Sequence, residues 1–339
     1  MNYKEVTQLF KSDLERVEQA LGDNFLSDIP IVPGIGEYIL NSGGKRIRPL
    51  LLLISSRLCG LELNEVVIKH CCVIENVHAA TLLHDDVVDE TTIRRGRETV
   101  NSKWGSDASI LVGDYLIAQS LTILSDDVDP MIFKAFSKAA KLLVEGGLVE
   151  FSNARDIHVT EKQCVDVIYR KTSSILSLSC QLGALIAQAG KEQGDALVAF
   201  GNHFGVAFQL MDDLMDYDGT YEQLGKPPGT DFKEGHVTLP LHHLYHHSGP
   251  ELQKEIERFI QNDKLTNKEL DYILDRMREG KALEYTLHQA YKHMARAIAA
   301  LQNTSFPVPK YKDALIAVSD YITGRYTLSK PSLANLPQI

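Results

Sequence analysis

Apolar positions recur every three or four residues along most of the chain, which is the spacing of one face of an α-helix. Near the amino terminus, Val6, Leu9, Phe10 and Leu14 follow this period, and few runs alternate between apolar and polar residues. The pattern therefore predicts an all-α protein. Further helices are expected over residues 46–59, 65–88, 107–124, 131–152, 161–189, 193–217, 250–261, 267–278, 281–301 and 311–325.

Short runs of turn-forming residues separate these segments. NSGG at 41–44, SDDVDP at 125–130 and GKPPG at 225–229 carry the Gly, Pro and Asp that start or end helices. No repeat of fixed period and no linker-like composition interrupts the pattern. We therefore expect residues 1–339 to form a single helical-bundle domain.

One uncharged stretch, residues 173–190, approaches the shortest length of a membrane-spanning helix. Its Ser, Gln and Gly content favours a buried central helix instead. The amino terminus is charged throughout and offers no apolar signal-peptide core. We therefore predict no transmembrane segment.

The composition excludes some partners and leaves others open. The chain has 339 residues, of which 44% are apolar, enough for a large core. Its 45 acidic and 35 basic residues give a net charge of -10, which argues against binding to nucleic acid. The five cysteines are odd in number and lack CxxC spacing, so we expect no disulfide framework and a cytoplasmic location.

Two clusters of aspartates lie within apolar helical segments. LLHDDVVDE contains Asp85, Asp86 and Asp89, and residues 85 and 89 share one side of a helix because they are four apart. FQLMDDLMDYDG repeats this spacing with Asp212, Asp213 and a third aspartate at 216. Like charges at this spacing destabilise a helix by about 0.2–0.5 kcal/mol per pair. A cation between the carboxylates would remove that cost.

The residue types around these clusters indicate a metal-bridged phosphate ligand. Mg²⁺ prefers a few carboxylates together with waters and phosphate oxygens. Arginine can bind phosphate oxygens in bidentate geometry, and lysine supplies a point charge. Basic residues near the acidic motifs that could do so are Lys45, Arg46, Arg48, Arg94, Arg95, Lys171 and Lys226.

These motifs, in this order, resemble those of the all-trans polyprenyl diphosphate synthases. The resemblance implies a bundle of the isoprenoid-synthase type around one deep central cavity, with the two aspartate motifs on facing helices near its mouth, and a homodimer. It rests on GGKRIRP (43–49), HAATLLHDDVVDETTIRRG (78–96), LVGDYL (111–116), KTS (171–173), QLMDDLMDYDG (209–219) and LGKPPGTDFKEGHVTLP (224–240).

The resemblance also implies the reaction, in which an allylic diphosphate is joined to isopentenyl diphosphate. Mg²⁺ held by Asp85, Asp89 and Asp212 would stabilise the departing diphosphate. An apolar pocket would keep water from the allylic cation. The resemblance further assigns catalytic roles to Asp86, Asp213 and Lys171, the allylic diphosphate site to Arg94, Lys171, Thr172, Gln209 and Lys226, and the isopentenyl diphosphate site to Lys45, Arg48, His78 and Arg95.

Two small residues bear on product length. Ala80 and Thr81 lie about one helical turn before Asp85, where an aromatic side chain would close the cavity under a short product. With only two residues between its aspartate groups, the first motif is similar to that of the long-chain bacterial branch, which makes octaprenyl or nonaprenyl diphosphate for quinone side chains. A shorter-chain farnesyl or geranylgeranyl diphosphate synthase is the alternative.

Three positions depart from typical patterns. His236 stands where relatives usually carry Lys, which puts the strength of allylic diphosphate binding in doubt, and Glu150 stands where Gln is common. The run HHLYHH at 242–247 has zinc-compatible spacing, but a solvent-facing helix is the favoured interpretation.

Two other functions are compatible with the aspartate motifs. A related lyase or terpene cyclase would ionise a diphosphate without isopentenyl diphosphate, but GGKRIRP argues for a second diphosphate site. A non-catalytic subunit of a heteromeric synthase would not need to keep both acidic motifs complete. The sequence therefore favours the synthase.

Overall fold

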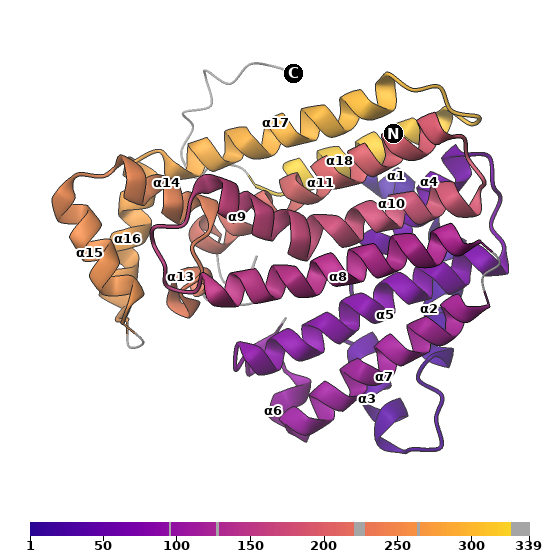
Figure 1. Ribbon diagram of the computed structural model, residues 1–339, viewed down its shortest axis with the longest axis horizontal. Coiled ribbons are helices and arrows are strands. Elements are labelled where there is room, and N and C mark those ends of the chain that lie inside the picture. The colour runs from indigo at the N-terminus through magenta and orange to yellow at the C-terminus, as the bar shows by residue number, and fades with distance from the viewer. Residues whose placement is uncertain (95, 127–128, 220–227, 263–264, 327–339) are drawn as a thin grey trace. The chain divides into compact units, whose positions relative to one another are not determined.

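The described part of the chain is built almost entirely from helices (Figure 1). The computed structural model describes residues 1–339 except 95, 127–128, 220–227, 263–264 and 327–339. Among the described residues the strands are β1 (Ile93–Arg94) and β2 (Arg97–Glu98), which pair antiparallel. The all-α prediction is confirmed.

The chain divides into two compact units. Unit 1 comprises residues 1–140, 175–201 and 300–318, and unit 2 comprises the described residues within 141–174, 202–299 and 319–339. Four long helices contain residues of both units: α8 (Pro130–Ser152), α11 (Lys191–Asp218), α17 (Ala282–Gln302) and α18 (Lys310–Thr323).

The remaining helices belong to one unit, apart from the first residue of α10. Those of unit 1 are α1 (Tyr3–Leu9), α2 (Lys11–Asp23), α3 (Ile31–Leu40), α4 (Ile47–Leu58), α5 (Glu65–Val88), α6 (Val100–Trp104), α7 (Ser106–Ser125) and α10 (Ser174–Ile186). Those of unit 2 are α9 (Glu161–Ile168), the π-helical turn η1 (Tyr169–Ser173), α13 (Thr230–Glu234), α14 (Leu239–His247), α15 (Pro250–Ile260) and α16 (Asn267–Glu279).

Side-chain caps set where several of these helices begin. Asn64 accepts a hydrogen bond from the Val67 amide at the start of α5. Thr160 and Thr266 form capping boxes with the residue three positions later, at the starts of α9 and α16. Such caps satisfy amides that a helix leaves without partners, and each contributes about 1 kcal/mol.

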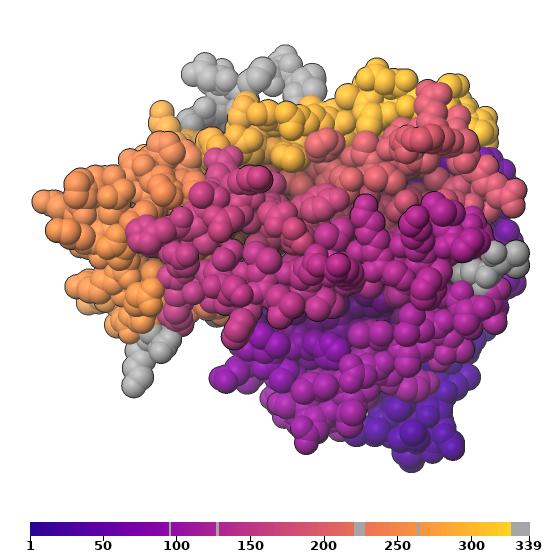
Figure 2. All heavy atoms as spheres, in the orientation of Figure 1, coloured from indigo at the N-terminus to yellow at the C-terminus, as the bar shows by residue number. Residues whose placement is uncertain are grey.

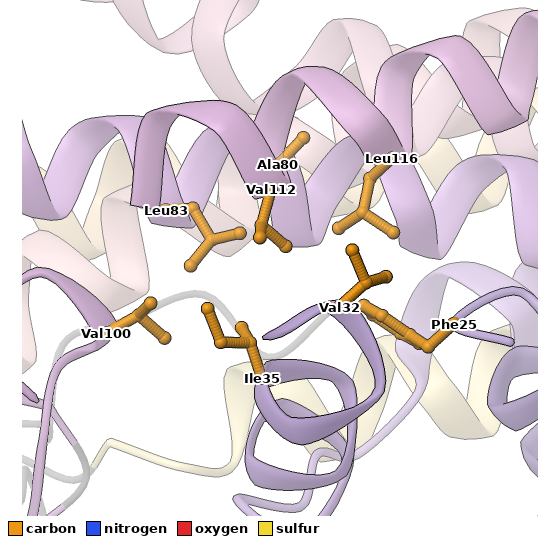
Figure 3. Packing of buried hydrophobic residues seen from close by; sticks show 8 residues of the cluster. All are labelled: Phe25, Val32, Ile35, Ala80, Leu83, Val100, Val112 and Leu116. Atoms are coloured by element: carbon orange, nitrogen blue, oxygen red, sulfur yellow. The ribbon is translucent and has the colours of Figure 1, made fainter. Parts of the chain in front are cut away.

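The core of unit 1 is organised around α5, which packs against α2, α4 and α7. One cluster joins side chains of α3, α5, α6 and α7 with Phe25, and its members point toward one another (Figure 3). Burying each larger aliphatic side chain contributes about 1.5–3 kcal/mol, so this cluster fixes the axis of α5. Its members are Phe25, Val32, Ile35, Ala80, Leu83, Val100, Val112 and Leu116.

Unit 2 packs its short helices around α14. This helix contacts α9, α15 and α16, and Leu239, Leu241 and Leu244 on it are buried. Gly205 of α11 lies against Ser173 so closely that a Cβ there would come within 2.5 Å of the Ser173 Cα. Glycine therefore lets α11 approach the π-helical turn.

Most predicted helices are confirmed, and the differences have local causes. The predicted helix over 161–189 is three elements, because η1 interrupts it between α9 and α10. The buried position of α10 is as predicted. Helix α3 was not predicted, because Pro33, Gly34 and Gly36 mask its helical pattern.

Two helices are long and apolar enough to cross a membrane by length and composition, α5 and α7. In the most apolar part of α5, 67% of residues are buried within the protein, which explains that helix as a core element. The corresponding part of α7 is 33% buried. Burial in the core therefore does not explain the apolar surface of α7.

Candidate active site

The first aspartate motif ends helix α5. Asp85 and Asp86 lie in its last turn, and Asp89 is the residue that caps it, with its amide donating to the Asp85 carbonyl at 2.8 Å. Asp85 and Asp89 are partly exposed, whereas Asp86 is only 5% exposed. The structure thus separates two carboxylates that can reach a ligand from one that supports the turn.

Asp86 is held by the segment that follows the helix. Its Oδ1 accepts a hydrogen bond from Arg94 Nε at 2.7 Å, and its carbonyl accepts one from the Asn101 amide group at 2.8 Å. Burial raises the pKa of Asp86, and the neighbouring Arg94 partly opposes that rise. Arg94, predicted to bind the allylic diphosphate, therefore also anchors the first motif.

The LVGDYL run explains how α7 supports this motif. A Cβ at Gly113 would lie 2.3 Å from Nε2 of His84, so only glycine leaves room for that ring. The same ring nitrogen lies 3.5 Å from a carboxylate oxygen of Asp114. Ser109 donates a hydrogen bond of 2.8 Å to the Leu83 carbonyl. These contacts fix the end of α5 against α7.

The predicted isopentenyl diphosphate residues lie in unit 1, apart from Arg95, which falls outside the described residues. Lys45 is exposed, and Arg48 at the start of α4 and His78 on α5 are partly exposed. The guanidinium of their neighbour Arg46 pairs with Glu18 and Glu75. Arg46 therefore also has a structural role, and its binding of diphosphate stays a prediction.

The two predicted chain-length residues have different surroundings. Ala80 is fully buried in the cluster of Figure 3, between α5 and its neighbours in unit 1. Thr81 is partly exposed and donates a hydrogen bond of 2.9 Å to the His78 carbonyl. Of the two positions, Thr81 is the one that can accept a larger side chain without overfilling a core.

The second aspartate motif lies in the last two turns of α11, in unit 2. Asp213 and Asp216 are each 2% exposed, and Asp212 is partly exposed. Gln209 donates to Asp213 Oδ1 at 2.9 Å and accepts a hydrogen bond from the Thr172 hydroxyl at 2.7 Å. The predicted residues Thr172, Gln209 and Asp213 therefore form one connected chain of hydrogen bonds.

Burial and neighbouring carboxylates raise the pKa of Asp213 well above its usual range. Among the neighbouring carboxylates, Asp231 has the largest effect on this pKa, and its backbone amide donates to Asp216 at 3.0 Å. Asp231 lies in the GTDFKEG stretch, and sequence reasoning assigned it no role because only the fold brings it to α11. Among the described residues, Oδ2 of Asp213 is buried without a hydrogen-bond partner.

Other partners of the second motif come from later in the chain. Arg325 Nη1 lies 3.0 Å from Asp212 Oδ1, and Asp218 accepts hydrogen bonds from Arg278 and Tyr326. Sequence analysis did not identify Arg325, since nothing local marks it as a partner of a residue 113 positions earlier. Arg325 occupies Asp212 Oδ1 and therefore competes with a cation for that oxygen.

The predicted diphosphate ligand Lys171 lies in η1 and forms an ion pair with Glu150 of α8. A π-helical turn within a helical run is often found at functional sites. Lys226 lies outside the described residues. His236, which stands where relatives usually carry Lys, is partly exposed. Its backbone amide donates to the Asp231 carbonyl at 2.8 Å.

The histidines at 242–247 differ from the solvent-facing expectation. His246 and His247 are exposed, but His242 is buried, and burial lowers its pKa to about 4. His243 stacks on Tyr285 with ring centroids 4.2 Å apart. No group of three metal-ligating side chains gathers anywhere in the described part of the chain.

The donor set nevertheless fits a divalent cation that arrives with a phosphorylated ligand. Mg²⁺ is commonly bound by one or two carboxylates, with waters and phosphate oxygens completing its shell. Both motifs end helices whose last turns carry no basic residue, and the helix macrodipole adds negative potential there. Among the described residues, the Asp213 oxygen that is buried without a hydrogen-bond partner is an acceptor that a nearby cation would satisfy.

Unit 1 contains the first motif with Arg94, Lys45, Arg48 and His78, and unit 2 contains the second motif with Lys171, Thr172 and Gln209. Direct contacts join Arg94 to the first motif, and Gln209 with Thr172 to the second. These features define an all-helical protein with two carboxylate-rich half-sites suited to cations and a phosphorylated ligand.

Comparison with known proteins identifies the family. The family model described as "Polyprenyl synthetase" matches residues 30–277. The chain is 36% identical over 325 residues to the octaprenyl diphosphate synthase of Escherichia coli, covering 96% of this chain and 99% of that protein. It is 32% identical to "Heptaprenyl diphosphate synthase component 2" of Bacillus subtilis, covering 96% and 91%. The chain belongs to the polyprenyl synthetase family and is a prenyltransferase.

A solved structure agrees with this assignment. The fold matches a polyprenyl synthase from Caulobacter crescentus with a TM-score of 0.91 and 32% identity, over 96% of this chain and 98% of that one. That protein was crystallised in complex with calcium and isoprenyl diphosphate. The isoprenoid-synthase type of helical fold is therefore confirmed.

The raised pKa of Asp213 gives a stability prediction. Burial and neighbouring carboxylates disfavour its charged form, so Asp213→Asn should raise the melting temperature in EDTA by about 2 °C or more. Asparagine can still accept the hydrogen bond from Gln209. Addition of MgCl₂ should stabilise the variant less than the wild type in thermal denaturation.

Asp212→Asn is the matched control for this measurement. It removes the same charge from a partly exposed residue that is paired with Arg325, so it should not raise the melting temperature in EDTA. A lower melting temperature for Asp213→Asn than for the wild type in EDTA would contradict this account of the buried carboxylates.

Proposed function

We propose that the protein is a long-chain all-trans polyprenyl diphosphate synthase that makes octaprenyl diphosphate for quinone side chains. It would add isopentenyl diphosphate repeatedly to an allylic diphosphate such as farnesyl diphosphate, with Mg²⁺ as cofactor. The observation that carries the proposal is the pair of aspartate motifs, each at the carboxyl end of a helix and each accompanied by cationic residues in its own unit.

In this proposal, some residues hold the cation that assists ionisation and others bind the allylic diphosphate directly. Mg²⁺, when bound, would stabilise the negative charge that develops on the leaving diphosphate. Asp85, Asp89 and Asp212 would hold it, while buried Asp86 and Asp213 keep those turns in place. Lys171 and Arg94 would hold the allylic diphosphate directly, and we propose the same role for Lys226.

The second substrate needs its own anion site. Lys45, Arg48, His78 and Arg95 would hold isopentenyl diphosphate, so that its double bond can attack the allylic carbon. Apolar residues precede both motifs along their helices, such as Leu83 before the first and Leu210 and Met211 before the second. We propose that one domain encloses a deep apolar cavity, which would exclude water from the allylic cation.

The proposed function is tested by incubating the protein with farnesyl diphosphate, isopentenyl diphosphate and MgCl₂, and sizing the products by chromatography. We expect successive elongation that EDTA abolishes. Release of diphosphate without elongation would instead indicate a lyase or terpene cyclase. Inactivity of the protein alone would indicate a subunit of a heteromeric synthase, a class that the "component 2" relative makes relevant.

Product length is the finer part of the proposal. The relatives named above make octaprenyl diphosphate or belong to a heptaprenyl diphosphate synthase, which supports a long product over a farnesyl or geranylgeranyl one. The small side chains of Ala80 and Thr81, one turn before Asp85, are consistent with this interpretation.

A larger side chain at Thr81 should shorten the product. We expect Thr81→Phe to give shorter prenyl chains in product sizing while the first condensation continues, because a phenyl group would occupy the path of the growing chain. Ala80→Phe should act in the same direction, but it also overfills a core, at a cost of about 1–3 kcal/mol.

The matched control for this prediction is Val66→Phe. Val66 is an exposed residue in the first turn of α5, far along the helix from the aspartates. We expect the control to make wild-type products. An unchanged product distribution for Thr81→Phe would rule out this assignment of the chain-length position.

We also propose that the protein is a homodimer and that α7 contributes to the contact. Ile110, Leu111 and Leu121 on α7 are exposed, and Leu111 is 66% exposed. α7 lies at the surface on the face shown in Figure 2. A second copy would bury this apolar side, whereas loose membrane association through the oily product is the alternative. A cytoplasmic location remains a prediction, supported by five free, buried cysteines.

The homodimer predicts that a charge on α7 separates the protomers. Leu111→Glu should sediment as a monomer in analytical ultracentrifugation at a concentration where the wild type is a dimer. Leu26→Glu changes an exposed leucine outside α7 and should remain dimeric. A wild-type monomer, or a dimeric Leu111→Glu variant, would contradict this proposal.

A further inference from the structure

Glu150, which stands where Gln is common, is paired with Lys171, the lysine that we assign to the allylic diphosphate. Glu150 of α8 and Lys171 of η1 form an ion pair within unit 2. Their side chains are 23% and 25% exposed, so solvent screens this pair less than a pair on an open surface. Neither the motif pattern nor the comparisons assign a role to Glu150.

The packing of α8 against η1 sets this contact. A Cβ at Gly146 would lie 2.8 Å from the Lys171 backbone nitrogen, so glycine allows the two backbones to approach closely. Glu150 follows Gly146 by four residues and therefore points from the same side of α8. Close backbone packing thus directs the Glu150 carboxylate to the Lys171 ammonium group.

The pair lies beside the hydrogen-bond chain of the second motif. Thr172, the residue after Lys171, donates to Gln209, and Gln209 donates to Asp213. Lys171 therefore directly precedes the first residue of this hydrogen-bond chain, in the half-site that we assign to the allylic diphosphate. A carboxylate at this position both attracts Lys171 and repels the oxygens of an incoming diphosphate.

We propose that Glu150 is a positioning residue that competes with diphosphate for Lys171 and thereby weakens binding at the allylic site. This inference rests on the proposed function, because it deepens the role assigned to Lys171. Diphosphate must take the ammonium group from Glu150 before Lys171 can hold it. A neutral glutamine would keep a hydrogen bond to Lys171 without repelling the diphosphate oxygens.

The direct test is binding of inorganic diphosphate by isothermal titration calorimetry at a fixed MgCl₂ concentration. Glu150→Gln should lower the Kd about fivefold, which is the size expected for removing one partly screened charge contact. Glu145→Gln is the matched control, because Glu145 lies on the same helix and pairs with Arg170 at 2.7 Å instead. The control should leave the Kd unchanged, and melting temperatures should show that both variants fold.

A double-mutant cycle separates competition for Lys171 from a general charge effect. In a Lys171→Met background, Glu150→Gln should lower the Kd for diphosphate by a smaller factor, because only the direct repulsion between Glu150 and the diphosphate remains to be removed. In steady-state assays with MgCl₂, Glu150→Gln alone should lower KM for the allylic diphosphate without raising kcat.

Equal Kd values for Glu150→Gln and wild type in this titration would overturn the inference, as would an undiminished effect in the Lys171→Met background. Wild-type elongation activity is measured in the same preparations. If the wild-type protein did not elongate the allylic diphosphate, the proposed function would be wrong. If the wild type elongated it but the Kd values showed no effect of Glu150→Gln, only the role of Glu150 would be wrong.

Discussion

Repulsion among carboxylates at the ends of two helices is the constraint on which the rest of the structure depends. Each motif has three aspartates within five residues near the carboxyl end of a helix, where the helix dipole is negative, and neither last turn carries a basic residue. Such an arrangement is unfavourable by itself. It becomes favourable when a cation and an anionic ligand of matching charge are bound together.

The surrounding structure holds these carboxylates in place without neutralising all of them. Asp86 is fixed by Arg94, and Asp213 by Gln209, whereas Asp85 and Asp89 stay partly exposed. Each motif therefore combines buried carboxylates that maintain the turn with more accessible ones. Glycines at 113 and 205 bring the supporting helix or turn close to each motif, so the geometry is preset before ligands arrive.

The sequence predicted the fold class, most helix positions and the residues of both motifs, because period and spacing are local signals. It could not predict contacts between distant segments. Packing determines the pairing of Arg325 with Asp212 and the approach of Asp231 to Asp213. It also determines the ion pair between Arg46 and Glu75. The burial of His242 was missed for the same reason, since α14 packs against the distant helix α9 as well as against α15 and α16.

The most direct test of the central claim is the number of divalent ions bound per chain in the presence of inorganic diphosphate, counted with Mn²⁺ by electron paramagnetic resonance. The account predicts that Asp85→Asn and Asp212→Asn each reduce the number or the affinity of bound ions, while both variants stay folded. Unchanged Mn²⁺ binding in both variants would contradict the claim that the aspartate motifs hold the cations.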